Sequence, residues 1–381
     1  MISIDSKLPD VGTTIFTVMS QYAQQHQAIN LSQGFPDFDG DDFLKQRVSH
    51  YINSGLNQYA PMTGLVQLRE QIANKIDSQY GLEVCPDRQV TVTSGATEAL
   101  FAAIMAVVKT GDEVVVLDPA YDSYDPAIRL AGGKAVHVAL NDDFSINFDA
   151  LRQACNARTR LLIINSPHNP SGATISYEDM LSLQSLVLEF DTLLLSDEVY
   201  EHIIFDGADH QSALRFSELA QRSFVVSSFG KTFHTTGWKV GYCVAPAELS
   251  TEFRKVHQYL TFSTSTPMQA AIADTLAEKP ELWQNLPRFY QQKRDHLQQA
   301  LAPSRLKLLP CRGTYFQVVD YSAISDLNEL DFAKWLTREV KVAVIPISVF
   351  YQQPREQKLA RLCFAKNEST LTQAAERLCQ L

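Results

Sequence analysis

Short runs of β-branched and aliphatic residues recur along the chain, and segments with a helical spacing of apolar positions separate them. Several runs are apolar throughout, which is typical of strands that are covered on both faces. In one intervening segment Leu100, Ile104 and Val108 form a single row on a helix. Alternation of strand and helix predicts an α/β fold with a mostly parallel, doubly wound sheet. The predicted strands are 90–93, 113–117, 161–165, 193–196, 224–228 and 240–244.

The pattern changes near Trp283, where a long polar helix is followed by a predicted strand at 314–319. A short amphipathic helix, two further strands and a terminal helix from Ser369 complete this part, which predicts a smaller α+β domain. A turn-rich segment at 36–40 indicates a hinge, so the first forty or so residues are expected to pack with the smaller domain. We predict a large domain at 46–282 and a small domain formed by 1–45 and 283–381.

The composition points to a small-molecule substrate. The 381 residues include 33 Lys plus Arg against 43 Asp plus Glu, and the net charge of -10 disfavours nucleic acid and anionic membranes as partners. No segment approaches the roughly 18 apolar residues of a membrane span, and the N-terminus lacks a signal-peptide pattern. The six cysteines show no metal-ligand spacing, so we expect free thiols and a cytoplasmic location.

Open α/β sheets bind ligands beyond the carboxyl ends of their strands, so the residues that follow each strand are the candidates for a ligand site. The small residues of 94–97 precede a helix and could admit a phosphate, although an ordinary helix cap has the same pattern. Tyr121 could stack on a planar ring or simply pack. Asn169, in a proline-interrupted turn, could donate a hydrogen bond or serve the turn alone.

Asp197 carries a sharper signal because it follows the apolar run 193–195. A carboxylate at the end of a buried strand is costly unless a cation pairs with it, and a protonated pyridine nitrogen would be such a cation. Tyr200, three residues later, could donate to a phenolate oxygen of the same ring.

Lys231 follows the last strand-like run before a Gly- and Trp-containing segment, in a context unlike a solvated surface loop. A nearby cation, Lys239, together with partial desolvation would lower the pKa of its amine and favour imine formation. A nucleotide P-loop is excluded, since Val225 stands where that motif needs glycine, and no GxGxxG follows a strand. The expected phosphate is therefore not that of ATP or NAD.

Together these residues give a resemblance to a known family. The chain resembles the fold-type I pyridoxal-phosphate enzymes, specifically the class I/II aminotransferases of the kynurenine/glutamine group, and is similar to the bacterial methionine-specific members of that group. The segments that carry the resemblance are 30–38, 57–61, 167–171, 196–200, 228–232, 237–241 and 361–366.

The resemblance implies a role for each matched residue. Lys231 corresponds to the lysine that attaches the cofactor and then acts as general base. Arg361 corresponds to the arginine that grips the substrate α-carboxylate, with Asn169 and the backbone of Gly34 assisting and Phe16 in the substrate pocket. The other cofactor contacts are Asp197 at the ring nitrogen, Tyr200 and Asn169 at the ring oxygen, Tyr121 on the ring face, and Gly95, Ala96, Thr97, Ser228, Lys239 and the partner subunit's Tyr59 at the phosphate.

The implied activity is a ping-pong transfer of the amino group of methionine, or of an aromatic or apolar amino acid, to a 2-oxo acid. The implied assembly is a homodimer with shared active sites. Two alternatives stay open on the sequence: a cysteine-conjugate C–S β-lyase that uses the same site, and a ligand-sensing regulator. The regulator fits less well, because such proteins carry a DNA-binding module and only about forty residues precede the large domain here.

Overall fold

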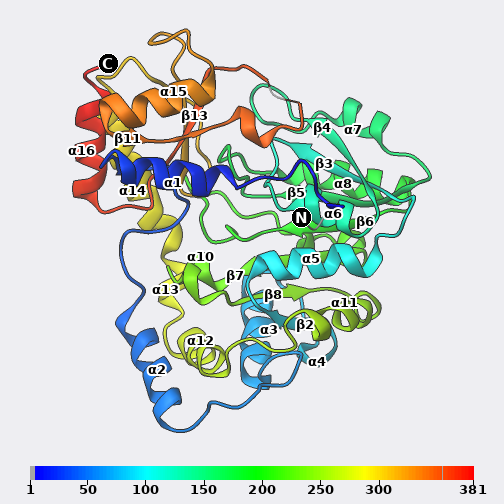
Figure 1. The fold of residues 1–381 in the computed structure, drawn as a ribbon. Helices are drawn as coiled ribbons and strands as arrows, with labels where there is room; N and C mark the ends of the chain where they lie inside the picture. The colour runs from blue at the N-terminus through cyan, green and yellow to red at the C-terminus, as the bar shows by residue number, and fades with distance from the viewer. Residues whose placement is uncertain (1–4, 354) are drawn as a thin grey trace.

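A seven-stranded sheet lies at the centre of the larger part of the molecule (Figure 1). The computed structural model describes residues 5–353 and 355–381. The strands are β2 Val90–Thr93, β3 Glu113–Asp118, β4 Lys134–Ala139, β5 Thr159–Asn165, β6 Leu193–Asp197, β7 Ser223–Ser228 and β8 Gly241–Val244. Their order is β2-β8-β7-β6-β5-β3-β4, and only the pairs that β8 forms with β2 and β7 are antiparallel. The prediction of a mostly parallel sheet is confirmed.

One strand of this sheet, β4, was missed in the sequence. It lies at the edge of the sheet beside β3. Its first residue, Lys134, is exposed, the next three are half-buried, and Val138 is buried. Lys134 and His137 interrupt its apolar residues, so β4 lacks the apolar or β-branched pattern by which the other six were recognised, whereas β2 at the opposite edge is buried throughout.

Helices cover both faces of the sheet. In β3, Val114 and Val116 belong to the apolar cluster on one face and Val115 to the cluster on the other, which explains the continuous apolar run of this strand. The first face carries α5 Ala96–Val107, α6 Tyr124–Leu130 and α11 Ala247–Leu260. The second carries α3 Val66–Tyr80, α8 Tyr177–Glu189 and α12 Thr266–Glu278, and α2 Asp42–Asn53 packs on α12.

Shorter helical segments connect these elements. They are α4 Pro86–Gln89, α7 Phe148–Ala154, η1 Ala213–Arg215, α9 Ser217–Ala220, α10 Phe229–Thr232, η2 Thr236–Trp238 and α13 Glu281–Gln284. Among them α10 is the important one for chemistry, because it begins directly after β7 and contains Lys231.

The C-terminal part forms a second apolar core around two small sheets. One sheet has the order β12-β13-β10-β9, and in the other β1 pairs in parallel with β11. The strands are β1 Ile29–Asn30, β9 Lys307–Leu308, β10 Phe316–Asp320, β11 Val342–Ala343, β12 Ile345–Pro346 and β13 Leu359–Cys363. The helices are α1 Ile15–Gln25, α14 Leu286–Leu301, α15 Glu329–Trp335, η3 Leu336–Val340, η4 Ser348–Phe350 and α16 Glu368–Leu378.

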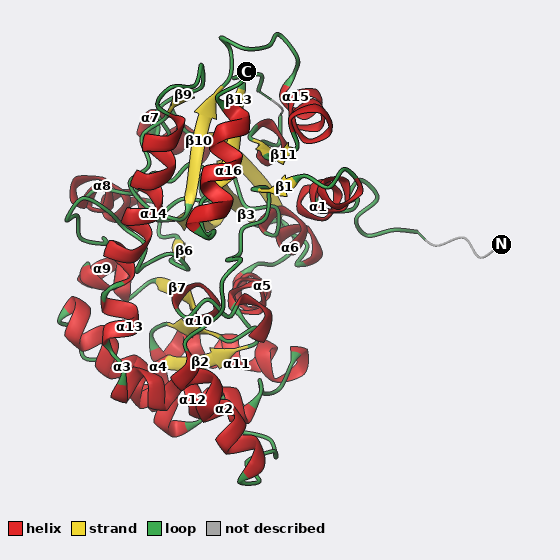
Figure 2. Ribbon diagram, turned by 90° about the vertical axis from the view of Figure 1, so that its left-hand side faces the viewer, coloured by secondary structure: helices red, strands yellow, loops and turns green. Residues whose placement is uncertain are grey.

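The N-terminal segment lies with this C-terminal part, since α1 contacts β11 and η3 (Figure 1). Figure 2 shows α2, α3 and α12 grouped at the opposite end of the molecule from α15 and α16. The division into domains at 46–282 and at 1–45 plus 283–381 stays a prediction. In the described part of the chain, no helix has the length and apolar character needed to cross a membrane.

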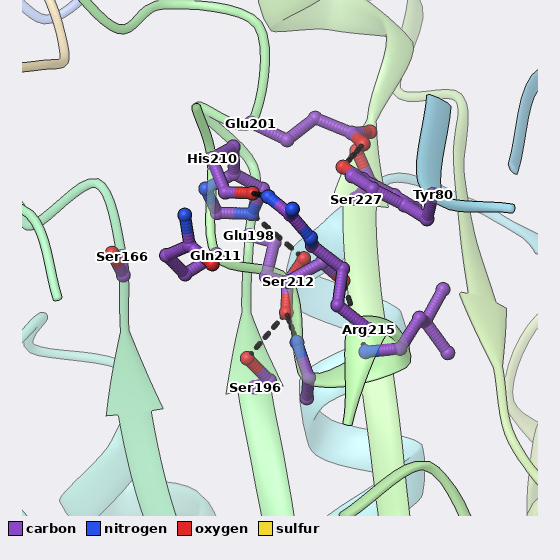
Figure 3. Close-up of polar contacts among 12 residues, drawn as sticks. Tyr80, Ser166, Ser196, Glu198, Glu201, His210, Gln211, Ser212, Arg215 and Ser227 are labelled. Atoms are coloured by element: carbon purple, nitrogen blue, oxygen red, sulfur yellow. Dashed lines mark hydrogen bonds and ion pairs between the residues drawn. The ribbon is translucent and has the colours of Figure 1, made fainter. Parts of the chain in front are cut away.

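A buried ionic network fills the interior behind the turn that follows β6. The Glu201 carboxylate accepts hydrogen bonds from Lys75 Nζ at 2.7 Å and Tyr242 Oη at 2.7 Å. It also accepts from Tyr80 Oη at 2.8 Å and from Ser227 Oγ, two residues labelled beside it in Figure 3. Burial alone would raise the pKa of the Glu201 carboxyl, but the Lys75 ammonium and these donors outweigh burial and hold the pKa well below its usual value. The network therefore keeps a charged carboxylate inside the core.

Glu198 is held in a second set of contacts close by. It accepts from Ser196 Oγ at 2.7 Å and lies 2.9 Å from His210 Nε2 (Figure 3). Glu198 and Glu201 thus fix the turn from behind, while Asp197 and Tyr200 from the same turn line the cavity described below.

We expect Lys75→Met to lower the free energy of unfolding by about 3–5 kcal/mol, because the substitution leaves the Glu201 carboxylate buried without its cation. Lys75 and Glu201 side chains are only 3% and 4% exposed. Urea unfolding measures the change. The matched control is Lys45→Met, which removes an exposed pairing with Asp39 and should change stability far less, because water screens that pair. Equal losses in the two variants would contradict the role of the network.

Candidate active site

A cavity of about 440 Å³ opens at the carboxyl ends of the parallel strands, and Phe316 of β10 and Arg361 of β13 also line it. This volume suits a small organic ligand. It brings together all of the predicted site residues except Tyr59. Those lining it are Phe16, Gly34, Gly95, Ala96, Thr97, Tyr121, Asn169, Asp197, Tyr200, Ser228, Lys231, Lys239 and Arg361.

The Lys231 amine lies in the wall of this cavity. Its Nζ is 2.9 Å from Tyr315 Oη and 3.2 Å from the carbonyl oxygen of Gly34. Burial lowers the pKa of the amine to about 8, and the positive charges of Arg361 and Lys239 act in the same direction. A substantial fraction of the amine is therefore neutral near physiological pH, which is the form that acts as nucleophile or base.

Asp197, the last residue of β6, is a buried carboxylate without a cation against it. Tyr124 Oη donates to its Oδ2 at 2.6 Å, and the backbone N–H of Val199 approaches its Oδ1 at 3.4 Å. Within the described residues Asp197 forms no ion pair, and burial raises the pKa of its carboxyl to about 6 in spite of the Tyr124 hydrogen bond. A cationic ligand group at this point would compensate the buried charge.

Arg361, in β13, is fully buried and reaches the cavity from the small sheet. Its Nη1 donates to Asn169 Oδ1 at 2.6 Å and its Nη2 to the carbonyl oxygen of Ser32 at 3.1 Å, while Nε has no partner among the described residues. Its guanidinium carbon lies 3.8 Å from the centroid of the Phe316 ring. Burial lowers its pKa to about 10, so the group stays cationic at neutral pH and can bind an anion.

The turn between β2 and α5 forms an anion cradle. Gly95 has a φ of +77°, and a Cβ there would come within 3.2 Å of Lys239 Nζ, so glycine lets the lysine approach the turn closely. Lys239 Nζ lies 3.4 Å from Thr97 Oγ1, and no described side chain caps α5. The positive end of the helix and the ammonium together favour a phosphate at this position.

Tyr59 is the predicted site residue that the structure does not bring into the cavity. Its side chain is 84% exposed and packs against Phe262 with ring centroids 5.5 Å apart. Within one chain it therefore cannot contact the cradle.

Two tyrosines that contact the reactive groups, Tyr124 and Tyr315, were missed in the sequence. Tyr124 stands three residues after Tyr121, but its place at the start of α6 gave no sign that it meets Asp197. Tyr315 lies inside the strand predicted at 314–319, where nothing in the sequence distinguishes it from a packing residue. Neither carries a charge or a motif spacing that would single it out.

A larger cavity of about 1110 Å³ lies nearby but shares only Tyr121 with the predicted site. Its lining mixes cations such as Arg312 and Arg355 with carboxylates such as Asp142, which pairs with Arg355 at 2.8 Å. We place the candidate site in the smaller cavity because the amine, the unpaired carboxylate and the buried arginine converge there.

The lining of the smaller cavity fits pyridoxal phosphate, the cofactor that the resemblance implies. Asp197 lacks the cation that a protonated ring nitrogen would supply, and the Gly95 turn with Lys239 suits a phosphate. The partly neutral Lys231 amine suits an aldehyde, and the unpaired Nε of Arg361 leaves the guanidinium able to receive a carboxylate. In the described chain, no group of metal-type ligands competes with this interpretation.

Comparisons with known proteins agree with this chemistry. The family described as aminotransferase class I and II matches residues 26–378. Methionine aminotransferase of Escherichia coli is 56% identical over 99% of this chain and 98% of its own length, and human kynurenine–oxoglutarate transaminase 1 is 32% identical over 93% of both. A crystal structure from E. coli, reported with a methionine aminotransferase function, superposes with a TM-score of 0.98 at 55% identity and covers both chains fully.

We expect Asp197→Asn to stabilise the cofactor-free chain at neutral pH. The folded state holds a proton on Asp197 up to about pH 6, whereas the unfolded carboxyl loses it near 3.8, so wild-type stability falls as the pH rises between these values. The variant has no such proton to lose. Its free energy of unfolding should therefore exceed that of the wild type by up to about 3 kcal/mol above pH 6 and should equal it below pH 4. Urea unfolding across pH measures the gain. Saturating cofactor should reverse the order at pH 7, and a variant less stable than wild type without cofactor would contradict this account.

Proposed function

Because the chain belongs to the class I and II aminotransferases, we propose that it transfers the amino group of methionine, or of an aromatic or apolar amino acid, to a 2-oxo acid with pyridoxal 5′-phosphate as cofactor. The observation that carries the proposal is the convergence of Lys231, Asp197 and Arg361 on one cavity. The comparisons support neither the C–S lyase nor the regulator as the main function.

Each side of the cavity would hold a different part of the cofactor. The Gly95 turn, with Ala96, Thr97, Ser228 and Lys239, would bind the phosphate, and Lys239 would contribute a point charge without the fork of an arginine. Tyr121 would stack on the ring. Asp197 would face the ring nitrogen, and Tyr200 and Asn169 the ring oxygen, with Tyr200 remaining a phenol because burial raises its pKa.

When bound, the cofactor supplies an electron sink for the carbanion at the substrate Cα. Asp197 holds the proton on the ring nitrogen, which the buried, otherwise unpaired carboxylate favours. Lys231 Nζ would act as the general base at the substrate Cα, where it would take up the proton and hold it for return during the transfer. Arg361 keeps the α-carboxylate fixed throughout, so that Cα stays within reach of the amine. The same residues act in reverse on the acceptor 2-oxo acid, which gives ping-pong kinetics.

The substrate side chain would meet an apolar wall. Phe16, Phe316 and Phe350 surround the Arg361 guanidinium, with ring centroids 5.3, 3.8 and 5.6 Å from its carbon. Among the described residues of the cavity lining, the cations are Lys231, Lys239 and Arg361, and each already has a proposed role. No lining cation is left for the second carboxylate of aspartate or glutamate, so apolar and thioether side chains fit better.

We also propose a homodimer. Tyr59, Tyr259, Leu260 and Phe262 form an aromatic and apolar surface that is between 43% and 86% exposed in one chain. A second copy covering this surface would bury it and would carry Tyr59 to the phosphate cradle of its partner.

The six cysteines are free thiols in the structure, and four of them are buried. Free thiols persist where the surroundings are reducing, and on this ground we propose a cytoplasmic location.

An amino-donor panel with a fixed 2-oxo acid tests the substrate preference. We expect kcat/KM for methionine and phenylalanine to exceed that for aspartate by about 10²-fold or more, since an uncompensated carboxylate against the apolar wall costs several kcal/mol. Lys231→Ala is the control and should abolish turnover of every donor. Turnover of aspartate without turnover of methionine would refute the assignment.

Tyr59→Phe tests the shared site. Removal of the hydroxyl should weaken cofactor binding about tenfold, the loss expected for one hydrogen bond to a charged group, and should leave the dimer intact. The control is Tyr259→Phe, which alters an equally exposed tyrosine three residues before Phe262 and should leave cofactor affinity unchanged. Cofactor titration and light scattering measure the two properties. A monomer, or equal affinities in the two variants, would count against the proposal.

A further inference from the structure

Tyr315 is the only described side chain whose hydrogen bond meets the reactive amine of Lys231. We infer that Tyr315 and the Gly34 carbonyl oxygen form a seat for the free amine of Lys231, which binds both of its N–H groups and turns its lone pair into the cavity. Tyr315 is then a positioning residue of the reaction. This inference rests on the proposed function.

The three groups form a closed triangle. Lys231 Nζ lies 2.9 Å from Tyr315 Oη and 3.2 Å from the Gly34 oxygen, and Tyr315 Oη in turn donates its proton to the Gly34 oxygen at 2.5 Å. Because the phenol proton is committed to Gly34, the lone pairs of Oη are left to accept from the amine. Burial raises the pKa of Tyr315 well above its usual value, so the side chain serves as a neutral acceptor and not as a competing base.

The seat determines which way the amine can react. A neutral amine has two N–H bonds and one lone pair. When two oxygens accept both N–H bonds, the lone pair takes the remaining direction, away from both oxygens. Lys231 lines the same cavity as Asp197 and Arg361. A lone pair that points away from the two oxygens of the seat therefore faces the space where the substrate Cα would lie.

The phenol is held rigidly enough to serve as a seat. Tyr315 is fully buried, and its ring packs against Phe316, Tyr200 and Tyr290 with centroids 4.9, 5.1 and 5.6 Å away. Reactive groups that are held by packed neighbours lose little time in unproductive orientations. Tyr315 and Gly34 both lie outside residues 46–282, so the amine is seated only when the two predicted domains meet.

The test compares Tyr315→Phe with Tyr290→Phe. Both substitutions remove a buried hydroxyl from the same aromatic cluster, but Tyr290 Oη has no hydrogen-bond partner among the described residues. In the holoenzyme we expect Tyr315→Phe to lower kcat with methionine about 10- to 100-fold with little change in KM, as for a misplaced base. Tyr290→Phe should retain the wild-type values. Urea unfolding should show Tyr315→Phe as the less stable variant, because only its hydroxyl is hydrogen-bonded, so kcat and KM are compared at a temperature where both variants are fully folded.

A second measurement does not depend on turnover. The rate at which pyridoxal 5′-phosphate attaches to the cofactor-free full chain, followed by visible absorbance, should rise with pH as the Lys231 amine loses its proton. Tyr315→Phe removes an acceptor that favours the ammonium form, so the midpoint should move down by about 0.5–1 pH unit and the plateau rate should fall. In Tyr290→Phe the midpoint and the plateau should stay in place.

The inference would be overturned if Tyr315→Phe and Tyr290→Phe gave the same kcat and the same midpoint and plateau rate of cofactor attachment. If Tyr315→Phe fails to fold, 3-fluorotyrosine at position 315 keeps the ring and weakens its oxygen as an acceptor. A smaller downward shift of the midpoint would then support the inference, and no shift would overturn it. Failure of the wild-type chain to attach the cofactor at Lys231 is a different result, because it refutes the proposed function itself.

Discussion

The buried carboxylate of Asp197 is the constraint on which the site depends. It stands at the end of an apolar strand, accepts hydrogen bonds from a tyrosine and a backbone amide, and meets no cation among the described residues. An isolated buried charge is costly, so the fold spends stability to keep this group in place. Binding of a cationic ligand group therefore stabilises the folded protein, because the ligand supplies the opposite charge that the buried carboxylate lacks.

The turn that carries Asp197 explains how the fold tolerates this cost. Asp197 and Tyr200 face the cavity, whereas Glu198 and Glu201 point into the interior, where His210 and Lys75 meet them. The two glutamates therefore have partners in the interior, whereas Asp197 on the cavity side has no cation among the described residues. Stability and function therefore occupy opposite sides of one short segment, which agrees with the general rule that binding groups are preorganised by a rigid second layer.

The site is completed by residues from outside the large sheet. Strand ends of the large sheet supply the lysine, the carboxylate and the phosphate cradle, but Arg361 and Tyr315 come from the part of the chain around β10 and β13, and Gly34 from the N-terminal segment. The amine of Lys231 touches groups from both of these latter segments. The same packing between these segments and the large sheet therefore positions both the substrate anchor and the base.

The sequence by itself determined the central strands, because continuous apolar runs leave few alternatives. It also indicated most of the reactive residues, because charges and glycines at several strand ends are informative when taken together and in matched motifs. The edge strand β4 and the two tyrosines at the site were decided by the tertiary structure. Tyr315 lies 84 positions from Lys231 and Tyr124 lies 73 positions from Asp197. In the sequence, a tyrosine of the core cannot be told from a tyrosine beside a catalytic amine. Packing between segments that are far apart in the chain decides which hydroxyl contacts which partner.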